Sequence, residues 1–367
     1  MQRMKWVDGL KGLACLGIFY HHFLLRYAPE SYYEMRNGPE SLFSRLADIP
    51  FGFMINGNFL VFLFILISGY VVSKRVMNTS NGEIGKFVIT RYFKLAFPIF
   101  VCESIYYICF ILGVGKNQLF VDDDNVGSYF MVLKNSFIGV LCFGDTKFAG
   151  AYWMMNFIFV GGIIIIAISL IGWKSEKYAM IVFAIISLAL LTQKIFYYSA
   201  IFLGAFLFYY LKRQSLKIPK YLYILIGIVG MFLGGYPTGL IPHNGIYHIF
   251  TLSFDIENSA YIWHWLAAFL MFYSIYHLSI IQNILEMKFI QWLGGISYIL
   301  FVFHNFMRKL MDPLYYWLLN YYDSQVIALF FYSSIVLILL FLFCEIYKRT
   351  FDVLFVKLIA IIVKPLA

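Results

Sequence analysis

The sequence predicts an all-α membrane protein that crosses a lipid bilayer about ten times. Of its 367 residues, 62% are hydrophobic and only 13% are charged, whereas soluble domains have about 45–50% apolar and about 25% charged residues. No water-soluble fold can bury this much apolar surface. A helix needs about 20 mostly apolar residues to cross a bilayer, and segments of about this length recur along the whole chain.

The ten predicted spans cover residues 7–27, 52–73, 93–113, 149–171, 178–193, 195–211, 221–238, 259–281, 289–307 and 325–347. Segment 128–143 is also apolar, and we interpret it as a re-entrant or interfacial piece. Residues 1–367 then form a single transmembrane domain without an added soluble domain. Residues 348–367 form a cytoplasmic tail, which we expect to lie in the membrane interface because lysines interrupt its apolar pattern.

The distribution of basic residues predicts the orientation. With the N-terminus in the cytoplasm, the cytoplasmic segments hold 18 of the 28 Lys and Arg residues, as the positive-inside rule requires. An even number of spans places both termini inside. The net charge of +9 then reflects basic loops, so we expect no nucleic-acid partner. The five cysteines show no metal-binding or disulfide spacing, and no metal site is expected.

The first span carries the densest set of ionisable residues: Asp8, Lys11, His21 and His22. Such groups cost about 2.5–3.5 kcal/mol each at the centre of a spanning helix and are functional candidates. Asp8 and Lys11 share a helix face and can pair. Lys11 and His22 return to the same face within about 20°, about 16 Å apart along the axis. The alternatives are an interfacial Asp8–Lys11 pair, a His22 that bridges helices and a structural His21.

The second and third spans add two further groups. Ser68 and Tyr70 end an apolar run, and Arg91 and Lys94 lie on one helix face at the predicted cytoplasmic mouth, before Pro98. Two cations in this position can hold phosphates. The alternative is that they only anchor the helix by the positive-inside rule.

Histidines gather in the predicted outer half. His264 lies early in the eighth span and His304 late in the ninth, which also contains Ser297 and Tyr298. The loop before His264 holds four more titratable residues: His243, His248, Asp255 and Glu257. Cations at the inner mouth and imidazoles in the outer half suit a protein that takes an anionic molecule from inside and acts on something outside.

These segments together resemble the acyltransferase 3 family of membrane O-acyltransferases, which modify bacterial surface glycans. The first span resembles the family's Asp-Gly-Leu-Arg opening and later His-Phe pair, with Lys11 in place of Arg and with His22 at the expected spacing. The point cation survives this replacement, but bidentate binding is lost.

Three more elements follow in order between residues 67 and 304. They are Ile67-Ser-Gly-Tyr-Val71, Arg91-Tyr-Phe-Lys-Leu-Ala-Phe-Pro98, and Gly294-Gly-Ile-Ser-Tyr298 followed by His304. The middle of the chain departs from the family, because Asn156 stands where many members have Glu.

The resemblance implies an O-acyltransferase, with acetyl as the expected acyl group, in the bacterial cytoplasmic membrane. The donor would be cytoplasmic acetyl-CoA or a similar acyl-CoA, used as a co-substrate with no bound cofactor. The acceptor would be a hydroxyl of a cell-surface polysaccharide or a lipid-linked glycan.

The resemblance also implies roles for the residues. His22 would act as general base or carry the acyl group, and Asp8 would position the first helix. Lys11, Arg91 and Lys94 would bind the phosphates of the donor. His304, Ser297 and Tyr298 would bind the acceptor or stabilise the oxyanion, and Ser68, Tyr70 and His264 would lie on the acceptor side.

Two other function classes compete with this interpretation. A glycan or lipid transporter or flippase would move its cargo without chemistry, and its usual signs are matching halves with interrupted helices, which the sequence does not display. A non-catalytic partner in glycan synthesis would use the histidines structurally. Replacing His22 with Ala separates the enzyme from this non-catalytic partner, because only an enzyme would lose activity while protein level and assembly persist.

Overall fold

The computed structural model describes residues 4–29, 50–115, 119, 127–171, 175–213, 218–238 and 246–364, and within these it contains helices and no strand. The predicted all-α class is therefore confirmed. Five segments among these residues are long and apolar enough to cross a membrane. They are Gly57–Met77, Ile84–Leu112, Gly150–Leu170, Lys288–Leu310 and Gln325–Val363.

Helices also occupy the remaining predicted spans, where they are shorter or more polar. They are α1 (Lys5–Tyr27), α8 (Glu176–Thr192), α9 (Phe196–Arg213), α10 (Lys220–Gly234) and the pair α11 (Ser259–His277) and α12 (Ser279–Leu285). Segment 128–143 forms a short apolar helix, Tyr129–Phe143. The chain is thus a multi-pass membrane protein, while the number of ten spans and the cytoplasmic termini stay predictions.

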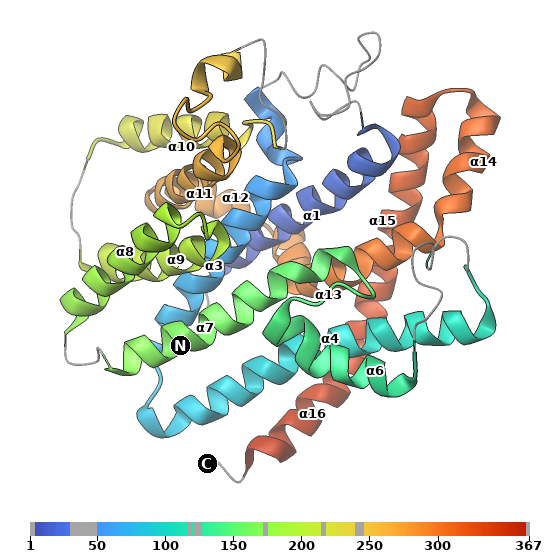
Figure 1. Ribbon diagram of the computed structural model, residues 1–367, viewed down its shortest axis with the longest axis horizontal. Coiled ribbons are helices and arrows are strands. Elements are labelled where there is room, and N and C mark those ends of the chain that lie inside the picture. The colour runs from blue at the N-terminus through green and yellow to red at the C-terminus, as the bar shows by residue number, and fades with distance from the viewer. Residues whose placement is uncertain are drawn as a thin grey trace. The chain divides into compact units, whose positions relative to one another are not determined.

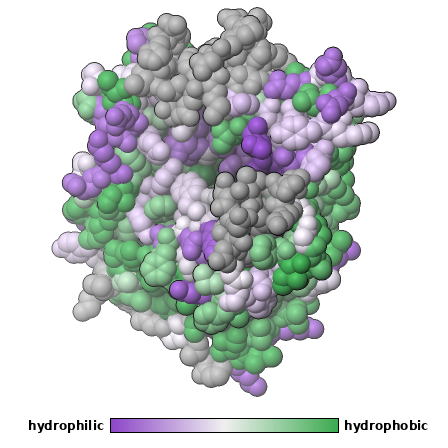
Figure 2. Space-filling view, turned by 45° about the vertical axis from the view of Figure 1, so that its right-hand side comes forward, coloured by the Kyte–Doolittle hydropathy of each residue, from purple (hydrophilic) through white to green (hydrophobic). Residues whose placement is uncertain are grey.

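The surface of the helices is apolar, as lipid contact requires. On α10 the exposed side chains include Ile224, Leu225 and Ile228, whereas Gly227 and Gly230 face Ser274 and Met271 of α11. Large residues thus point outward and small ones permit close helix contact, which is typical of packing in membranes. Figure 2 shows hydrophobic residues over broad areas of one face of the molecule.

Residue contacts divide the chain into two compact units, and each is described by itself. The first contains Met1–Asn78 and Ile164–Gly295. Within it α3 (Gly57–Met77) packs along α9, α9 packs along α8, and α10 packs along α11. Two short 3-10 turns, Pro50–Met54 and Ile246–Phe250, precede α3 and α11. Figure 1 shows α3 beside α9.

The second unit contains Thr79–Ile163 and Ile296–Ala367. Its helices are α4 (Ile84–Leu112), α6 (Tyr129–Lys134), a π-helical segment Asn135–Phe143, α14 (Asp312–Tyr322), α15 (Gln325–Arg349) and α16 (Phe351–Val363). Short 3-10 turns at Asn81–Glu83 and Gly150–Trp153 lead into α4 and α7. The helices α7 (Met154–Ile171) and α13 (Lys288–Leu310) contribute residues to both units.

Two segments differ from the sequence prediction. The span expected at 259–281 is bent by 97° between α11 and α12, where Leu278 has extended backbone angles. The bend is stabilised because the Gln282 side-chain amide donates to the carbonyls of Ile275 and Tyr276, which satisfies groups left open at the end of a helix. Helix α14 lies between the ninth and tenth predicted spans and was not predicted.

The C-terminal segment packs against α4. Ile359 and Val363 of α16 form a buried cluster with Phe97, and the ring of Phe355 stacks on that of Phe97 with centroids 4.1 Å apart. The apolar positions of this tail are thus partly used in the second unit. Its last residues, 365–367, lie outside the described residues, and its predicted place in the membrane interface stays a prediction.

Candidate active site

The ionisable pair at the start of α1 is formed. Lys11 Nζ lies 2.9 Å from a carboxylate oxygen of Asp8, and both side chains are largely shielded from solvent. The pair lies beside a close helix crossing, because a Cβ on Gly294 of α13 would meet the Asp8 carbonyl oxygen and one on Gly12 would meet the Gly294 nitrogen. The predicted Asp8–Lys11 contact is therefore present, and Gly12 and Gly294 permit the close approach of α1 and α13 beside it.

The two histidines of α1 have different surroundings. The ring of His21 lies against Gly57, where no Cβ would fit, and its Nδ1 is 3.2 Å from the Ile55 carbonyl oxygen. His22 is half-buried on the neighbouring face, and its ring meets that of His21 edge to face at 5.3 Å. The structure thus gives His21 the packing role that one sequence alternative allowed, and His22 remains on the Lys11 face of the helix.

His264 is fully buried in a hydrogen-bond network. Its Nε2–H donates to the Tyr236 carbonyl at 2.8 Å, and its Nδ1 accepts from the Asn58 amide at 2.8 Å. Asn58 in turn accepts from the Tyr197 hydroxyl at 2.7 Å. Both ring nitrogens of His264 thus form hydrogen bonds within the protein. Together with Asn58 and Tyr197, they join α3, α9 and α11. The acceptor-side role predicted for His264 stays a prediction, and its geometry favours a structural role.

The Ser68–Tyr70 segment lies where α3 and α9 touch. A Cβ on Gly69 would come within 1.9 Å of the Ile201 carbonyl oxygen, and one on Gly204 within 1.9 Å of the Leu66 carbonyl oxygen. The glycine of this motif therefore serves close backbone packing. Ser68 is half-buried beside it, and Tyr70 is buried between the rings of Phe208 and Phe272.

Arg91 and Lys94 belong to the second unit. One guanidinium nitrogen of Arg91 donates to the Ile158 carbonyl at 3.0 Å, and the group packs against Gly162 of α7. Lys94 is exposed. Of these two predicted phosphate ligands, Arg91 thus also joins α4 to α7, whereas Lys94 extends from the surface of α4.

Ser297, Tyr298 and His304 of the late motif also lie in the second unit. The Tyr298 hydroxyl donates to the Leu95 carbonyl at 2.6 Å, close to Pro98, which interrupts the hydrogen bonding of α4. Ser297 is buried. His304 is buried, and its Nδ1 is 2.6 Å from the Phe301 carbonyl oxygen one turn earlier. Because a carbonyl only accepts, Nδ1–H is the donor, and this hydrogen bond fixes the orientation of the ring.

Glu103 is a buried acid that the sequence analysis missed. It is fully buried on α4, where its two carboxylate oxygens accept from the Asn135 amide at 2.8 Å and the Ser136 hydroxyl at 2.7 Å. Both donors lie at the start of the π-helical segment. Near its end, the side-chain amide of Asn156 donates to the carbonyls of Leu141 and Cys142. The sequence contained a signal for this residue, because Glu103 is the one acidic residue within the predicted span 93–113.

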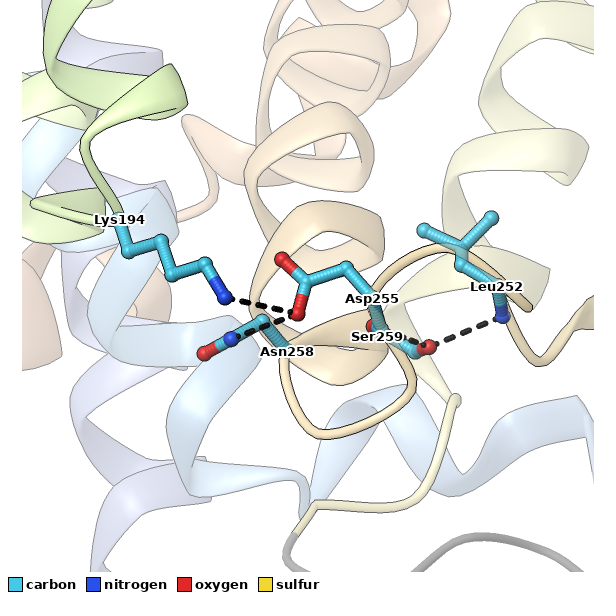
Figure 3. Close-up of polar contacts among 5 residues, drawn as sticks. All are labelled: Lys194, Leu252, Asp255, Asn258 and Ser259. Atoms are coloured by element: carbon cyan, nitrogen blue, oxygen red, sulfur yellow. Dashed lines mark hydrogen bonds and ion pairs between the residues drawn. The ribbon is translucent and has the colours of Figure 1, made fainter.

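Asp255 organises the loop before α11. Its carboxylate accepts from the Asn258 amide at 2.8 Å and from Lys194 at 3.1 Å, and Figure 3 shows both donors reaching the same oxygen. These contacts, Asn258 first, lower the pKa of Asp255. Glu257 and His248 of the same loop are exposed, and His243 lies outside the described residues.

No group of three or more His, Cys, Asp or Glu side chains within the described part of the chain is arranged to hold a metal ion. An ion pair and a half-buried imidazole on one helix, α1, are side chains suited to group transfer.

Comparison with known families gives the class. The model of an acyltransferase domain, Acyl_transf_3, matches residues 4–347. The chain therefore belongs to this family and is a membrane acyltransferase, as its motifs indicated. Neither the comparison with curated proteins nor that with solved structures returned a match.

Proposed function

We propose that this membrane acyltransferase moves an acyl group, acetyl in the first instance, from cytoplasmic acyl-CoA to a hydroxyl of a cell-surface polysaccharide or a lipid-linked glycan. The family match supports acyl transfer. To this family assignment we add the acyl-CoA donor, the glycan acceptor and the location in a bacterial cytoplasmic membrane.

The observation that carries the proposal is the polar face of α1. It holds the Asp8–Lys11 ion pair near one end and the half-buried His22 about 16 Å further along the same face. An ion pair three residues apart stabilises the helix that carries it, and an imidazole with a basic nitrogen can accept a proton from a hydroxyl.

The reaction follows from these groups. His22 takes the proton of the acceptor hydroxyl while the hydroxyl oxygen attacks the thioester carbonyl. The carbon–sulfur bond then breaks, and the CoA thiolate leaves and is protonated. In the alternative order, His22 forms the bond to the acyl carbon first and the sugar oxygen then displaces it. Either order converts a thioester and an alcohol into an ester and a thiol.

The late histidine supports the same chemistry. The hydrogen bond from its Nδ1–H to the Phe301 carbonyl fixes the orientation of the His304 ring. We assign it, with Ser297 and Tyr298, to the acceptor or the oxyanion. Tyr298 also holds the Leu95 carbonyl, so that the loss of its hydroxyl would affect both packing and activity.

The test is acyl transfer in reconstituted vesicles that hold the purified protein, with labelled acetyl-CoA on the cytoplasmic face and cell-envelope glycan as acceptor. Label in the glycan is the expected result. If acetyl-CoA and longer acyl-CoA donors all fail with a competent acceptor present, a glycan or lipid transporter becomes the better hypothesis. Movement of labelled glycan across the vesicle without acylation would identify that alternative directly.

A further inference from the structure

A cavity of 540 Å³ lies at one end of the first unit. It is lined by the start of α1, the ends of α3 and α9, and the bend between α11 and α12. The residues that define its character are Trp6, Tyr70, Lys74, Phe208, Lys212 and Tyr276. Ligand pockets typically measure about 300–1,000 Å³ and combine apolar walls with a few polar groups, and this cavity has that composition.

Two lysines give the cavity a positive charge. Lys74, in the last turn of α3, is half-buried and forms no ion pair with any residue that the structure describes. Lys212, in the last turn of α9, pairs with Glu176. The cavity lining thus contains two ammonium groups and no carboxylate, and the lysine without an ion pair among the described residues, Lys74, is the one less exposed to water. Charge in such a place binds an anion more strongly than on an open surface.

The other walls are aromatic and fixed. Trp6 is buried and meets the ring of Tyr276 edge to face at 6.2 Å. Tyr70 is buried and meets Phe208 edge to face at 5.6 Å. These rings pack on one another and so are held before any ligand arrives. A ligand that carries both a phosphate and a flat ring would use the two kinds of wall at once.

Lys74 differs from the cations that the sequence pointed to. Lys11 is already paired with Asp8 at 2.9 Å, and Arg91 donates to the Ile158 carbonyl at 3.0 Å. Neither of these two contributes to this cavity. The cation with an aromatic pocket around it is therefore Lys74.

We propose that this cavity binds an organic phosphate and that it holds the nucleotide end of the acyl-CoA donor. Lys74 is the main phosphate ligand, Lys212 the second, and the aromatic walls contact the base. This assignment rests on the proposed function. Trp6 and His22 are separated by about 24 Å along α1 at about 1.5 Å per residue, and the long pantetheine arm of the donor is the part that would bridge this distance.

The test measures binding without turnover, with adenosine 3′,5′-bisphosphate as the probe and purified protein in lipid nanodiscs. Lys74→Gln is expected to weaken binding at least fivefold, and Lys212→Gln to weaken it less. Arg75→Gln is the matched control, because it removes a neighbouring charge on α3 that does not line the cavity, and its affinity should equal wild type. Inorganic phosphate and short-chain phosphatidylglycerol, the other probes, should bind more weakly than the nucleotide.

Unchanged nucleotide affinity in both lysine variants would overturn the proposal. So would stronger, Lys74-dependent binding of phosphatidylglycerol, which would assign the cavity to a lipid headgroup. The acylation assay separates this proposal from the proposed function. If transfer occurs with a KM for acyl-CoA that Lys74→Gln leaves unchanged, only the pocket assignment fails. If nucleotide binding depends on Lys74 but no transfer occurs with any acyl-CoA donor, only the proposed function fails.

Discussion

At the scale of single residues, the histidines separate by how their ring nitrogens are used. His264 binds a carbonyl and an amide at 2.8 Å each, which leaves no ring nitrogen for a substrate. His21 is wedged against Gly57 and the Ile55 carbonyl. His22 lies on the face that also holds the Asp8–Lys11 pair. The same residue type thus serves packing in two cases and suits chemistry in the third.

The buried acid gives a prediction at this scale. Glu103→Ala would leave the buried Asn135 amide without its acceptor, and such a group costs about 1–3 kcal/mol, so the protein should unfold at lower temperature. Glu103→Gln should keep most of the stability, because Ser136 Oγ also lies 2.7 Å from the Val132 carbonyl and can accept from the new amide. Thermal unfolding in detergent measures both. An alanine variant as stable as wild type would contradict this role.

At the scale of elements, close backbone contact decides which helices pair. Gly69 of α3 and Gly204 of α9 each occupy a position where a side chain would meet a carbonyl oxygen of the other helix. In membranes, helix association depends on such packing rather than on hydrophobic burial. The Ser-Gly-Tyr motif that suggested a substrate site is therefore first a packing motif, with Tyr70 extending from it into the cavity.

Gly69→Ala tests this packing. The added methyl group would lie 1.9 Å from the Ile201 carbonyl oxygen, so the helices must separate and the yield of folded protein should fall sharply. The matched control is Gly85→Ala on α4, where a Cβ meets nothing within 4 Å and where Ala favours the helix. Size-exclusion chromatography and thermal unfolding report the result. Equal behaviour of the two variants would show that α3 and α9 do not need this contact.

The link between the α8–α9 turn and the loop before α11 predicts a pH dependence. Asn258 and Lys194 lower the pKa of Asp255 below its ordinary value of 3.8, so its ionised form favours the folded state. This contribution is present above pH 3.8 and is lost as the pH falls through the lowered pKa. Asp255→Asn should therefore melt slightly below wild type at neutral pH, and the difference should vanish in acid. A difference that grows in acid would contradict the assignment.

At the scale of the whole molecule, composition was enough to predict the class, since no other environment suits so apolar a chain. The polar residues of α1 and the Asp8–Lys11 pair followed from helix periodicity alone. The bend at Leu278 did not, because it depends on Gln282 reaching back to the carbonyls of Ile275 and Tyr276, a contact without a local pattern. Asn135 and Ser136 likewise meet Glu103 only through tertiary packing.

The cavity shows the same limit. Trp6, Lys74, Lys212 and Tyr276 come from four distant parts of the chain, and no spacing rule links them. The sequence placed both lysines in segments predicted to face the cytoplasm, and the structure brings them to one cavity of the first unit. The distribution of basic residues predicted on which side of the membrane the lysines lie. Only the fold shows which of the cations line the cavity.

The measurement that tests the central claim most directly is acyl transfer to glycan by His22→Ala beside wild type in the reconstituted vesicles. General-base or covalent catalysis by His22 predicts a loss of about 10²–10⁴-fold in rate, with unchanged protein level and unchanged thermal unfolding. His248→Ala is the control, because His248 is exposed in a 3-10 turn and should keep the wild-type rate. Wild-type transfer by a folded His22→Ala protein would contradict the account.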